Sequence, residues 1–178
     1  ALRYLYGRAP LRTGDDTYLL GAGESNAQTT VVDDGGVDAL DASALPTGVS
    51  LDLTPGHLSS AGLSSAGKVG VDNLALPATT WVENAVGSAF DDVLLGNDLD
   101  NWLKGGPGND WVDGGQGVDT VVFDGVRAAY EVSNAFGKVY VESRDGSGGF
   151  DTLGHVERLH FADTTVTLAP AVLSSDVV

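Results

Sequence analysis

The sequence predicts an all-β fold, a right-handed parallel β-roll in which the chain winds between two sheets. Three observations predict it. Residues 87–122 divide into four nine-residue segments with no residue inserted or lost between them. Glycine is frequent, with 25 residues in a chain of 178, and 20 of the 25 acidic residues are aspartate. Each segment also has a large aliphatic residue at its eighth position. A nine-residue period of this kind is typical of a β-solenoid.

The four nonads read GSAFDDVLL, GNDLDNWLK, GGPGNDWVD and GGQGVDTVV. The last two nonads have glycine at positions 1, 2 and 4, which allows a tight turn in which backbone carbonyls converge. Positions 7 to 9 then predict a short strand whose middle side chain points inward. Since nine residues make half a coil, nonads i and i+2 stack on one side of the roll. The inward residues are Leu94, Leu103, Val112 and Val121, and the sixth positions hold Asp92, Asn101, Asp110 and Asp119.

The segments around the nonads predict less regular structure. Residues 1–12 have the apolar spacing of a helical stub that belongs to an upstream domain, and residues 13–86 read as irregular β coils. Residues 123–168 predict a capping segment with an antiparallel hairpin around Asn134–Gly137, and residues 169–178 form a tail. Individual strands are expected at Val49–Leu53, Tyr130–Ser133, Lys138–Glu142, Leu159–Phe161 and Thr165–Leu168.

Two degenerate nonads extend the pattern. Residues 33–41 read DDGGVDALD and residues 146–154 read GSGGFDTLG, with Asp38 and Asp151 at the sixth positions. Each is followed by a strand-like Val-Glu, in TWVENAV and HVERLHF respectively. These degenerate repeats indicate that irregular coils extend the roll at both ends.

The stacked sixth positions point to a bound cation. At the inter-strand spacing of about 4.8 Å, two carboxylates repel by roughly 3 kcal/mol at an effective dielectric near 20. A Ca²⁺ ion between the turns would replace this repulsion by attraction, because carboxylate and carbonyl oxygens are the ligands that calcium prefers. We therefore expect several calcium ions and a roll that is poorly folded without them and orders when they bind. The alternatives are metal-free polar turns and magnesium, which resists sites built from protein carbonyls.

Composition excludes several other classes of function. The formal net charge of −16 disfavours nucleic acid and anionic membranes as partners. With no cysteine, the chain has neither disulfides nor thiolate metal sites. It contains no apolar run long enough to insert into a membrane. No catalytic motif is found, so we expect no enzymatic activity from this chain.

Other candidate residues have ordinary explanations. His57, His155 and His160 lack zinc-site spacing and are expected at the surface or in strands. Trp102 and Trp111 stand at position 7, which faces outward on opposite sheets. They would either stack on sugar rings or, as we favour, be covered by flanking strands. Paired aspartates in the nonads could imitate a glycosidase site, but calcium turns explain them better.

Six motifs precede the nonads in the order ALRYLYG, RTGDDTY, DDGGVDALDAS, SLDLTPGHLSSAG, KVGVDN and WVENAVG. With the nonads, they resemble the C-terminal β-roll domain of serralysins, secreted bacterial zinc metalloproteases. The ending VERLHFAD is similar to one shared more widely among RTX secreted proteins. The resemblance implies calcium binding, export by a type I ABC secretion apparatus, and folding outside the cell. The H-E-x-x-H zinc helix of the proteases is missing from this chain.

The resemblance also implies a set of calcium ligands. In the nonads, one turn would supply positions 2, 4 and 6, and the turn one coil later positions 1, 3 and 6. Two irregular sites would precede them, and another would join the third nonad to the second degenerate repeat. The implied ligands, ion by ion, are Arg12, Gly14, Asp33, Gly35 and Asp38; Gly36, Asp38 and Glu83; Ser88, Phe90, Asp92, Gly105, Pro107 and Asp110; Asn97, Leu99, Asn101, Gly114, Gln116 and Asp119; and Gly106, Gly108, Asp110 and Asp151.

This sequence departs from the family pattern at two of these sites. The RTGDDTY loop has one more aspartate than the RTGDT of the family, which leaves its third ligand open. Asn101 stands in place of an acid, so its site is expected to bind calcium more weakly.

Two functions of different classes follow from these patterns. The first is a calcium-dependent folding and secretion module of a larger extracellular protein, a serralysin-like metalloprotease. The tail SSDVV, an acid followed by aliphatic residues, resembles the export signal of such proteins. The second is a stand-alone or adhesin-derived module that binds a carbohydrate or another surface ligand.

Overall fold

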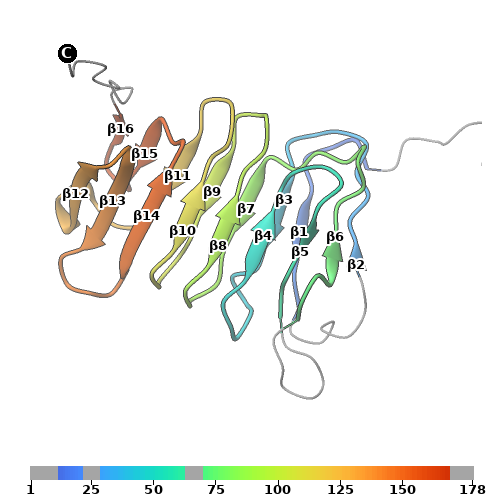
Figure 1. Cartoon of the computed structure of the whole chain (residues 1–178), viewed down its shortest axis with the longest axis horizontal. Coiled ribbons are helices and arrows are strands. Elements are labelled where there is room, and N and C mark those ends of the chain that lie inside the picture. The colour runs from blue at the N-terminus through green and yellow to red at the C-terminus, as the bar shows by residue number, and fades with distance from the viewer. Residues whose placement is uncertain (1–11, 22–28, 63–69, 169–178) are drawn as a thin grey trace, which may run out of the picture.

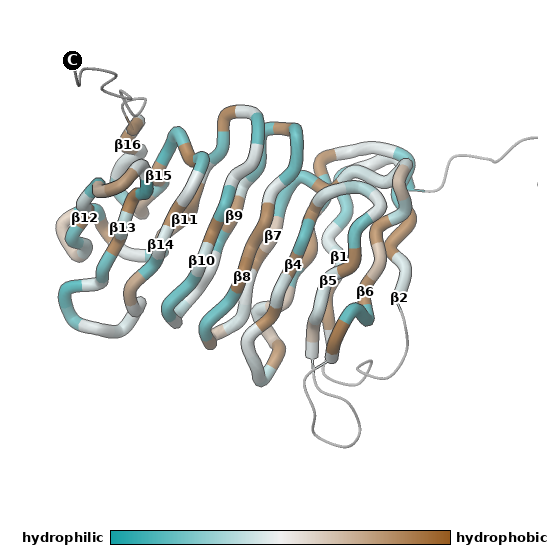
Figure 2. Tube along the Cα trace, viewed as in Figure 1, coloured by the Kyte–Doolittle hydropathy of each residue, from teal (hydrophilic) through white to brown (hydrophobic). Residues whose placement is uncertain are grey.

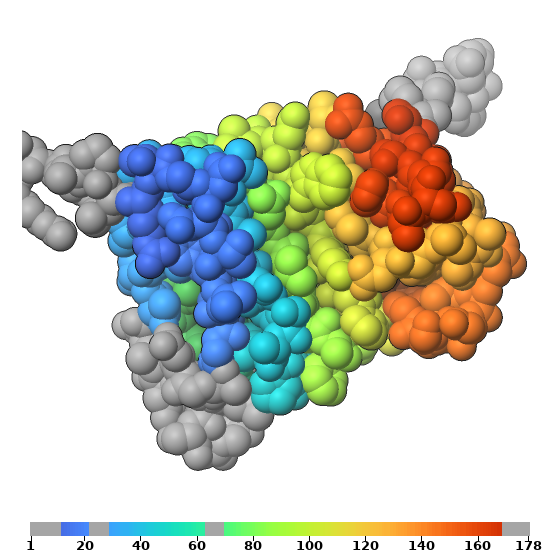
Figure 3. All heavy atoms as spheres, turned by 180° about the vertical axis from the view of Figure 1, so that it is seen from behind, coloured from blue at the N-terminus to red at the C-terminus, as the bar shows by residue number. Residues whose placement is uncertain are grey.

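The computed structural model describes residues 12–21, 29–62 and 70–168. The expected helical stub, apart from Arg12, and the expected tail lie outside these residues. Short strands stack side by side along the long axis of the molecule, from β1 to β6 at one end to β12 to β16 at the other (Figure 1). Seen from behind, the N-terminal coils and the C-terminal cap occupy opposite ends (Figure 3). The described residues contain no helix that is long and apolar enough to cross a membrane.

The described residues form two main sheets and a small third sheet. The first sheet contains, in spatial order, β1 (Thr17–Leu19), β3 (Ala39–Asp41), β7 (Asn84–Val86), β9 (Trp102–Lys104), β11 (Thr120–Val122), β15 (Arg158–His160) and β16 (Thr165–Thr167). The second contains β4 (Ser50–Asp52), β8 (Val93–Leu95), β10 (Trp111–Asp113), β14 (Phe150–Gly154), β13 (Lys138–Ser143) and β12 (Tyr130–Ala135). The third contains β2 (Thr29–Thr30), β6 (Leu74–Ala75) and β5 (Leu58–Ser59).

The nonads alternate between the two main sheets, as their period predicts. Strand β8 pairs in parallel with β10, so that Leu94 lies opposite Val112. Strand β9 pairs in parallel with β11, so that Leu103 lies opposite Val121. Each nonad is therefore half a coil, and the all-β parallel roll is confirmed.

The core runs between the two sheets along the whole stack. The four eighth-position side chains are at most 2% exposed. The strands outside the nonads continue the row with Leu40, Leu51, Leu153 and Leu159, each buried. Figure 2 shows the hydrophobic colour along β8 and the hydrophilic colour in the turns beneath β8 and β10. Since each buried Leu or Val contributes about 1.5–3 kcal/mol, this row holds the sheets together.

The C-terminal cap is the expected antiparallel hairpin, with a tighter turn than predicted. Strand β12 continues to Ala135, which pairs with Lys138, so only Phe136 and Gly137 form the turn. Both have positive φ, 54° and 74°, as a two-residue turn of the I′ type requires. The strands expected at Leu159–Phe161 and Thr165–Leu168 appear one residue earlier or shorter, as β15 and β16. Three rings then cover the end of the core, with centroids 5.1–5.4 Å apart: Phe123, Tyr130 and Phe161.

Candidate calcium sites

A ladder of polar side chains runs beneath each main sheet. In most coils a polar residue at or just before the strand stacks on its counterpart in the next coil, and its side-chain oxygen accepts a backbone N–H of the coil before. Asn101 differs, because its Oδ1 accepts the Asn97 N–H of its own turn at 2.8 Å. The hydrogen bonds of the first ladder are Asp16 N to Asp38 Oδ1 (2.7 Å), Asp38 N to Glu83 Oε2 (2.8 Å), Asn101 N to Asp119 Oδ1 (2.8 Å) and Asp119 N to Glu157 Oε2 (2.8 Å). Those of the second are Val49 N to Asp92 Oδ1 (2.7 Å), Asp92 N to Asp110 Oδ1 (2.9 Å) and Asp110 N to Asp151 Oδ1 (2.9 Å).

The second oxygen of several ladder carboxylates has no such partner. Among the described residues, the Oδ2 atoms of Asp38, Asp110 and Asp119 are buried without any hydrogen bond. A buried carboxylate oxygen without a partner is costly, and a bound cation removes the cost. The arrangement therefore fits a calcium ion in the turn.

The pKa values of these carboxyl groups point in the same direction. Burial, with the nearby charges of Asp151 and Asp92, raises the pKa of Asp110 from 3.8 to about 8. Burial likewise raises the pKa of Asp151 to about 7, and burial together with Glu157 raises that of Asp119 to about 6. Burial also raises the pKa values of Asp38 and Asp92. The turns thus disfavour several negative charges unless positive charge is added to them.

Backbone carbonyls enter the same turns because glycine leaves them room. Gly108 has φ 137°, and a Cβ there would lie 2.6 Å from the carbonyl oxygen of Phe90. Gly117 has φ 110°, and its Cβ would lie 2.6 Å from the carbonyl oxygen of Leu99. A side chain at either glycine would therefore fill the space between two stacked turns.

Residues 86–122 match the family of the RTX calcium-binding nonapeptide repeat, in four copies. The four nonads are RTX repeats. RTX repeats bind several Ca²⁺ ions along their length and are typical of extracellular bacterial proteins. No curated protein matches the chain.

The structure brings together the residues expected around the two central ions. A Cβ on Gly87 would meet both the Asp92 carboxylate and the Gly105 carbonyl, so these oxygens converge. A Cβ on Gly96 would meet the Asn101 Oδ1 and the Gly114 carbonyl in the same way. An equivalent pair of oxygens therefore converges at Gly87 and at Gly96, although which oxygens coordinate calcium stays a prediction.

Asn101 also has a role that an acid could not take. Its Nδ2 donates to the Glu83 carbonyl at 2.9 Å and to Asn97 Oδ1 at 3.1 Å. The amide thus joins the first RTX turns to the irregular coil before them.

The site expected between the third RTX repeat and Asp151 also comes together, despite the inserted hairpin. Strand β14 pairs in parallel with β10, and Trp111 lies opposite Thr152. A Cβ on Gly149 would clash with the Gly108 carbonyl. The inserted strands β12 and β13 pair beyond β14 at the end of the second sheet, so the second degenerate repeat still stacks directly on β10.

The N-terminal site contains a residue that was not foreseen. Oxygens of Asp16, Asp33 and Asp38 lie within 4.8 Å of one another. Asp33 also accepts a hydrogen bond from the Tyr18 hydroxyl. Asp16 is the additional aspartate of RTGDDTY, and its place directly before a strand was the signal that could have identified it. The Arg12 carbonyl, an expected ligand, accepts the Asp34 N–H at 3.1 Å.

The neighbouring expected ligands around this site are close to one another. A Cβ on Gly36 would clash with the Gly14 carbonyl. Gly35 N–H donates to Asp33 Oδ1 at 2.8 Å, and Glu83 approaches Asp38 through the ladder. The two irregular sites therefore share one corner of the roll.

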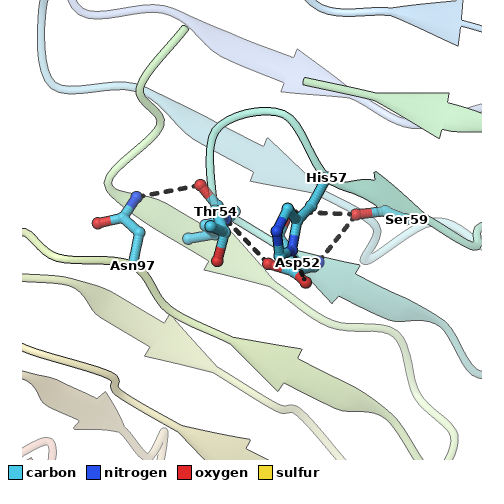
Figure 4. Close-up of polar contacts among 6 residues, drawn as sticks. Asp52, Thr54, His57, Ser59 and Asn97 are labelled. Atoms are coloured by element: carbon cyan, nitrogen blue, oxygen red, sulfur yellow. Dashed lines mark hydrogen bonds and ion pairs between the residues drawn. The ribbon is translucent and has the colours of Figure 1, made fainter. Parts of the chain in front are cut away.

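The histidines make local hydrogen bonds near the surface. His57 Nδ1 lies 2.8 Å from Asp52 Oδ2, as Figure 4 shows, while the Ser59 hydroxyl accepts the Asp52 N–H at 2.8 Å. Because the acid stands between the serine and the imidazole, this group lacks the order of a serine nucleophile and its base. His155 Nδ1 bonds to Asp113 at 2.7 Å, and His160 Nδ1 to Thr165 at 2.8 Å.

The tryptophans at position 7 face outward on opposite sheets, but the flanking strands cover them only in part. Trp102 is 50% exposed, with the His160 ring 5.3 Å away. Trp111 is 42% exposed, and Lys138 Nζ lies 5.3 Å from its ring centroid. The expectation that flanking strands cover both tryptophans is therefore wrong, because about half of each side chain stays exposed.

Proposed function

We propose that this chain is a module whose folding is driven by extracellular calcium and which stabilises a larger secreted protein. The observation that carries the proposal is the set of buried Oδ2 atoms of Asp38, Asp110 and Asp119, which lack a partner within the described residues. Calcium binding energy is folding energy when the site exists only in the folded chain. A cell interior with little free calcium would leave the chain poorly folded, and extracellular calcium would order and stabilise it.

Far-UV circular dichroism and thermal melting in EGTA and in millimolar calcium test this proposal. We expect the β signal and the melting temperature to rise with calcium, and magnesium at the same concentration to have little effect. Identical spectra and melting curves in EGTA and calcium would contradict it.

The proposed parent is a serralysin-like metalloprotease exported by a type I ABC apparatus. The support is the order of the motifs before the RTX repeats and the acid-plus-aliphatic tail. RTX repeat domains are typically non-catalytic, so catalysis would belong to the upstream domain. An H-E-x-x-H-x-x-G-x-x-H motif upstream would support this parent, and adhesive domains upstream would count against it. Secretion of a reporter fused to residues 87–178 through a type I system tests the export role.

The half-exposed tryptophans favour one second candidate function, an extracellular binding module. A flat indole such as that of Trp102, half exposed on a rigid sheet, can stack on a sugar ring. A glycan array with the calcium-loaded chain and its Trp102→Ala and Trp111→Ala variants tests this function. Binding that either variant abolishes would support it, and an array without binding would exclude carbohydrate.

A further inference from the structure

We propose that the turn His155–Glu157, between β14 and β15, completes a calcium site with the last RTX repeat. This turn lies outside the matched repeats, and none of its residues was among the expected ligands. The inference rests on the proposed calcium-dependent folding. It adds an ion that fastens the capping strands to the roll.

The side chain of Glu157 occupies a ladder position. Its Oε2 accepts the Asp119 N–H at 2.8 Å, just as Asp119 Oδ1 accepts the Asn101 N–H one coil earlier. The Glu157 N–H in turn donates to the Asp119 carbonyl at 3.1 Å. Glu157 therefore stands at the sixth position of a following coil, directly before β15.

The His155 carbonyl completes the likeness to the central RTX turns. A Cβ on Gly114 would lie 2.5 Å from Asp119 Oδ2 and would clash with the His155 carbonyl oxygen. At Gly87, the Asp92 carboxylate and the Gly105 carbonyl converge in the same manner. His155 thus takes the place of a position-1 glycine, and its φ of 47° turns the backbone there.

The strongest indication of a bound ion comes from Asp119. Its side chain is fully buried, and its Oδ2 has no hydrogen-bond partner within the part of the chain that the structure describes. This oxygen is directed toward Gly114 and the His155 carbonyl. Gly115 and Gly117 hold positions 2 and 4, the carbonyl donors expected toward a following coil. Two carboxylates and several carbonyls make a donor set that suits calcium.

The short turn explains why glutamate, and not aspartate, stands here. Only Val156 separates His155 from Glu157, whereas an RTX repeat has four residues between positions 1 and 6. The extra methylene of glutamate lets the carboxylate reach the turn from a backbone that lacks the full loop. The N-terminal coils contain the same arrangement: Glu83 also follows a valine, and its carboxylate accepts the Asp38 N–H at 2.8 Å.

Two variants of the full chain test the site by calcium titration calorimetry. Glu157→Gln keeps an oxygen for the Asp119 N–H but loses the charge, so one ion per chain should bind about 10-fold more weakly. Glu157→Ala should bind one ion fewer. The matched control, Glu142→Gln, changes an exposed glutamate on β13 and should titrate like the unchanged chain.

Hydrogen exchange gives a local second measurement. In calcium, residues 158–168 should exchange faster in both Glu157 variants than in the control, while residues 87–122 keep their protection. Equal ion numbers, affinities and exchange in all variants would overturn the inference and leave the proposed function standing. If the unchanged chain binds no calcium, the proposed function and this inference both fail.

Discussion

The RTX repeats and the irregular coils around them share the same two side-chain hydrogen-bond ladders but build their turns differently. In the repeats, the turn has a constant length, and Gly108 and Gly117 admit the carbonyls of the turn before. In the irregular coils, the turns vary in length, and Glu83 and Glu157 reach the ladder with longer side chains. The comparison teaches that the ladder tolerates turns of different length, provided that an acceptor side chain reaches the N–H of the coil before.

The largest expected effect comes from Asp110, which joins two expected ion sites. Asp110→Asn keeps the acceptor for the Asp92 N–H but removes a charge that calcium needs. In millimolar calcium we expect the melting temperature to fall by about 10 °C, and in EGTA to stay equal or rise, because a buried repulsion is lost. Differential scanning calorimetry in both buffers measures this.

Asp100→Asn is the matched control for that variant. Asp100 is exposed and accepts the Val118 N–H at 2.9 Å, also one coil away. The Asp100→Asn variant should have nearly the same melting temperature as the unchanged chain, both in calcium and in EGTA. An equal fall for Asp110→Asn in EGTA would mean that Asp110 acts only through hydrogen bonds.

A smaller effect is expected from filling an RTX turn. Gly108→Ala combines a φ of 137° with a Cβ 2.6 Å from the Phe90 carbonyl, so it should cost about 3 kcal/mol of unfolding free energy. Gly137→Ala, in the hairpin turn at φ 74° with nothing within 4 Å, should cost about 1 kcal/mol. Urea denaturation in calcium compares the two. Equal losses would show that strain alone, and not the approach of stacked turns, determines the cost.

The pH dependence should have opposite signs with and without calcium. In EGTA, the raised pKa values of Asp119, Asp151 and Asp110, about 6, 7 and 8, mean that the folded chain binds protons more tightly than the unfolded one. Their contribution to stability is full below the ordinary pKa of 3.8 and is lost as pH rises through 6 to 8. Melting temperatures in EGTA should thus be higher at pH 5 than at pH 8. In excess calcium they should be lower at pH 5, because protons compete with the ions. The same trend in both buffers would contradict the role of these carboxylates as ligands.

The smallest effect is expected for Asn101→Asp. The added charge should strengthen calcium binding at one site by a few-fold, while loss of the donor to the Glu83 carbonyl weakens the contact with the irregular coil. Calorimetric titration should show tighter binding, together with a small decrease of the melting temperature in EGTA. Weaker calcium binding would show that the amide contact matters more than the charge.

The repeat region was predictable in detail, and the irregular coils were predictable only in outline. The nonad period gave the alternation of β8 to β11 and the burial of Leu94, and the degenerate repeats correctly placed Leu40 and Leu153 in the core. Asp16 and Glu157 were missed because no constant spacing connects them to the nonads. The hairpin around Phe136 was expected, but its turn was tighter, since the strand pairing continues to Ala135.

The sequence by itself determined the period, the inward aliphatic row and the presence of clustered carboxylates, because each is a matter of local spacing. Only the tertiary structure decided which carboxylate oxygen bonds to which coil. Stacking brings Asp110 against Asp92 and Asp151, so one oxygen takes the backbone N–H and the other is left for an ion. It also decided that the inserted strands β12 and β13 pair beyond β14 while Asp151 stacks directly on Asp110, because pairing depends on position in space and not on separation along the chain.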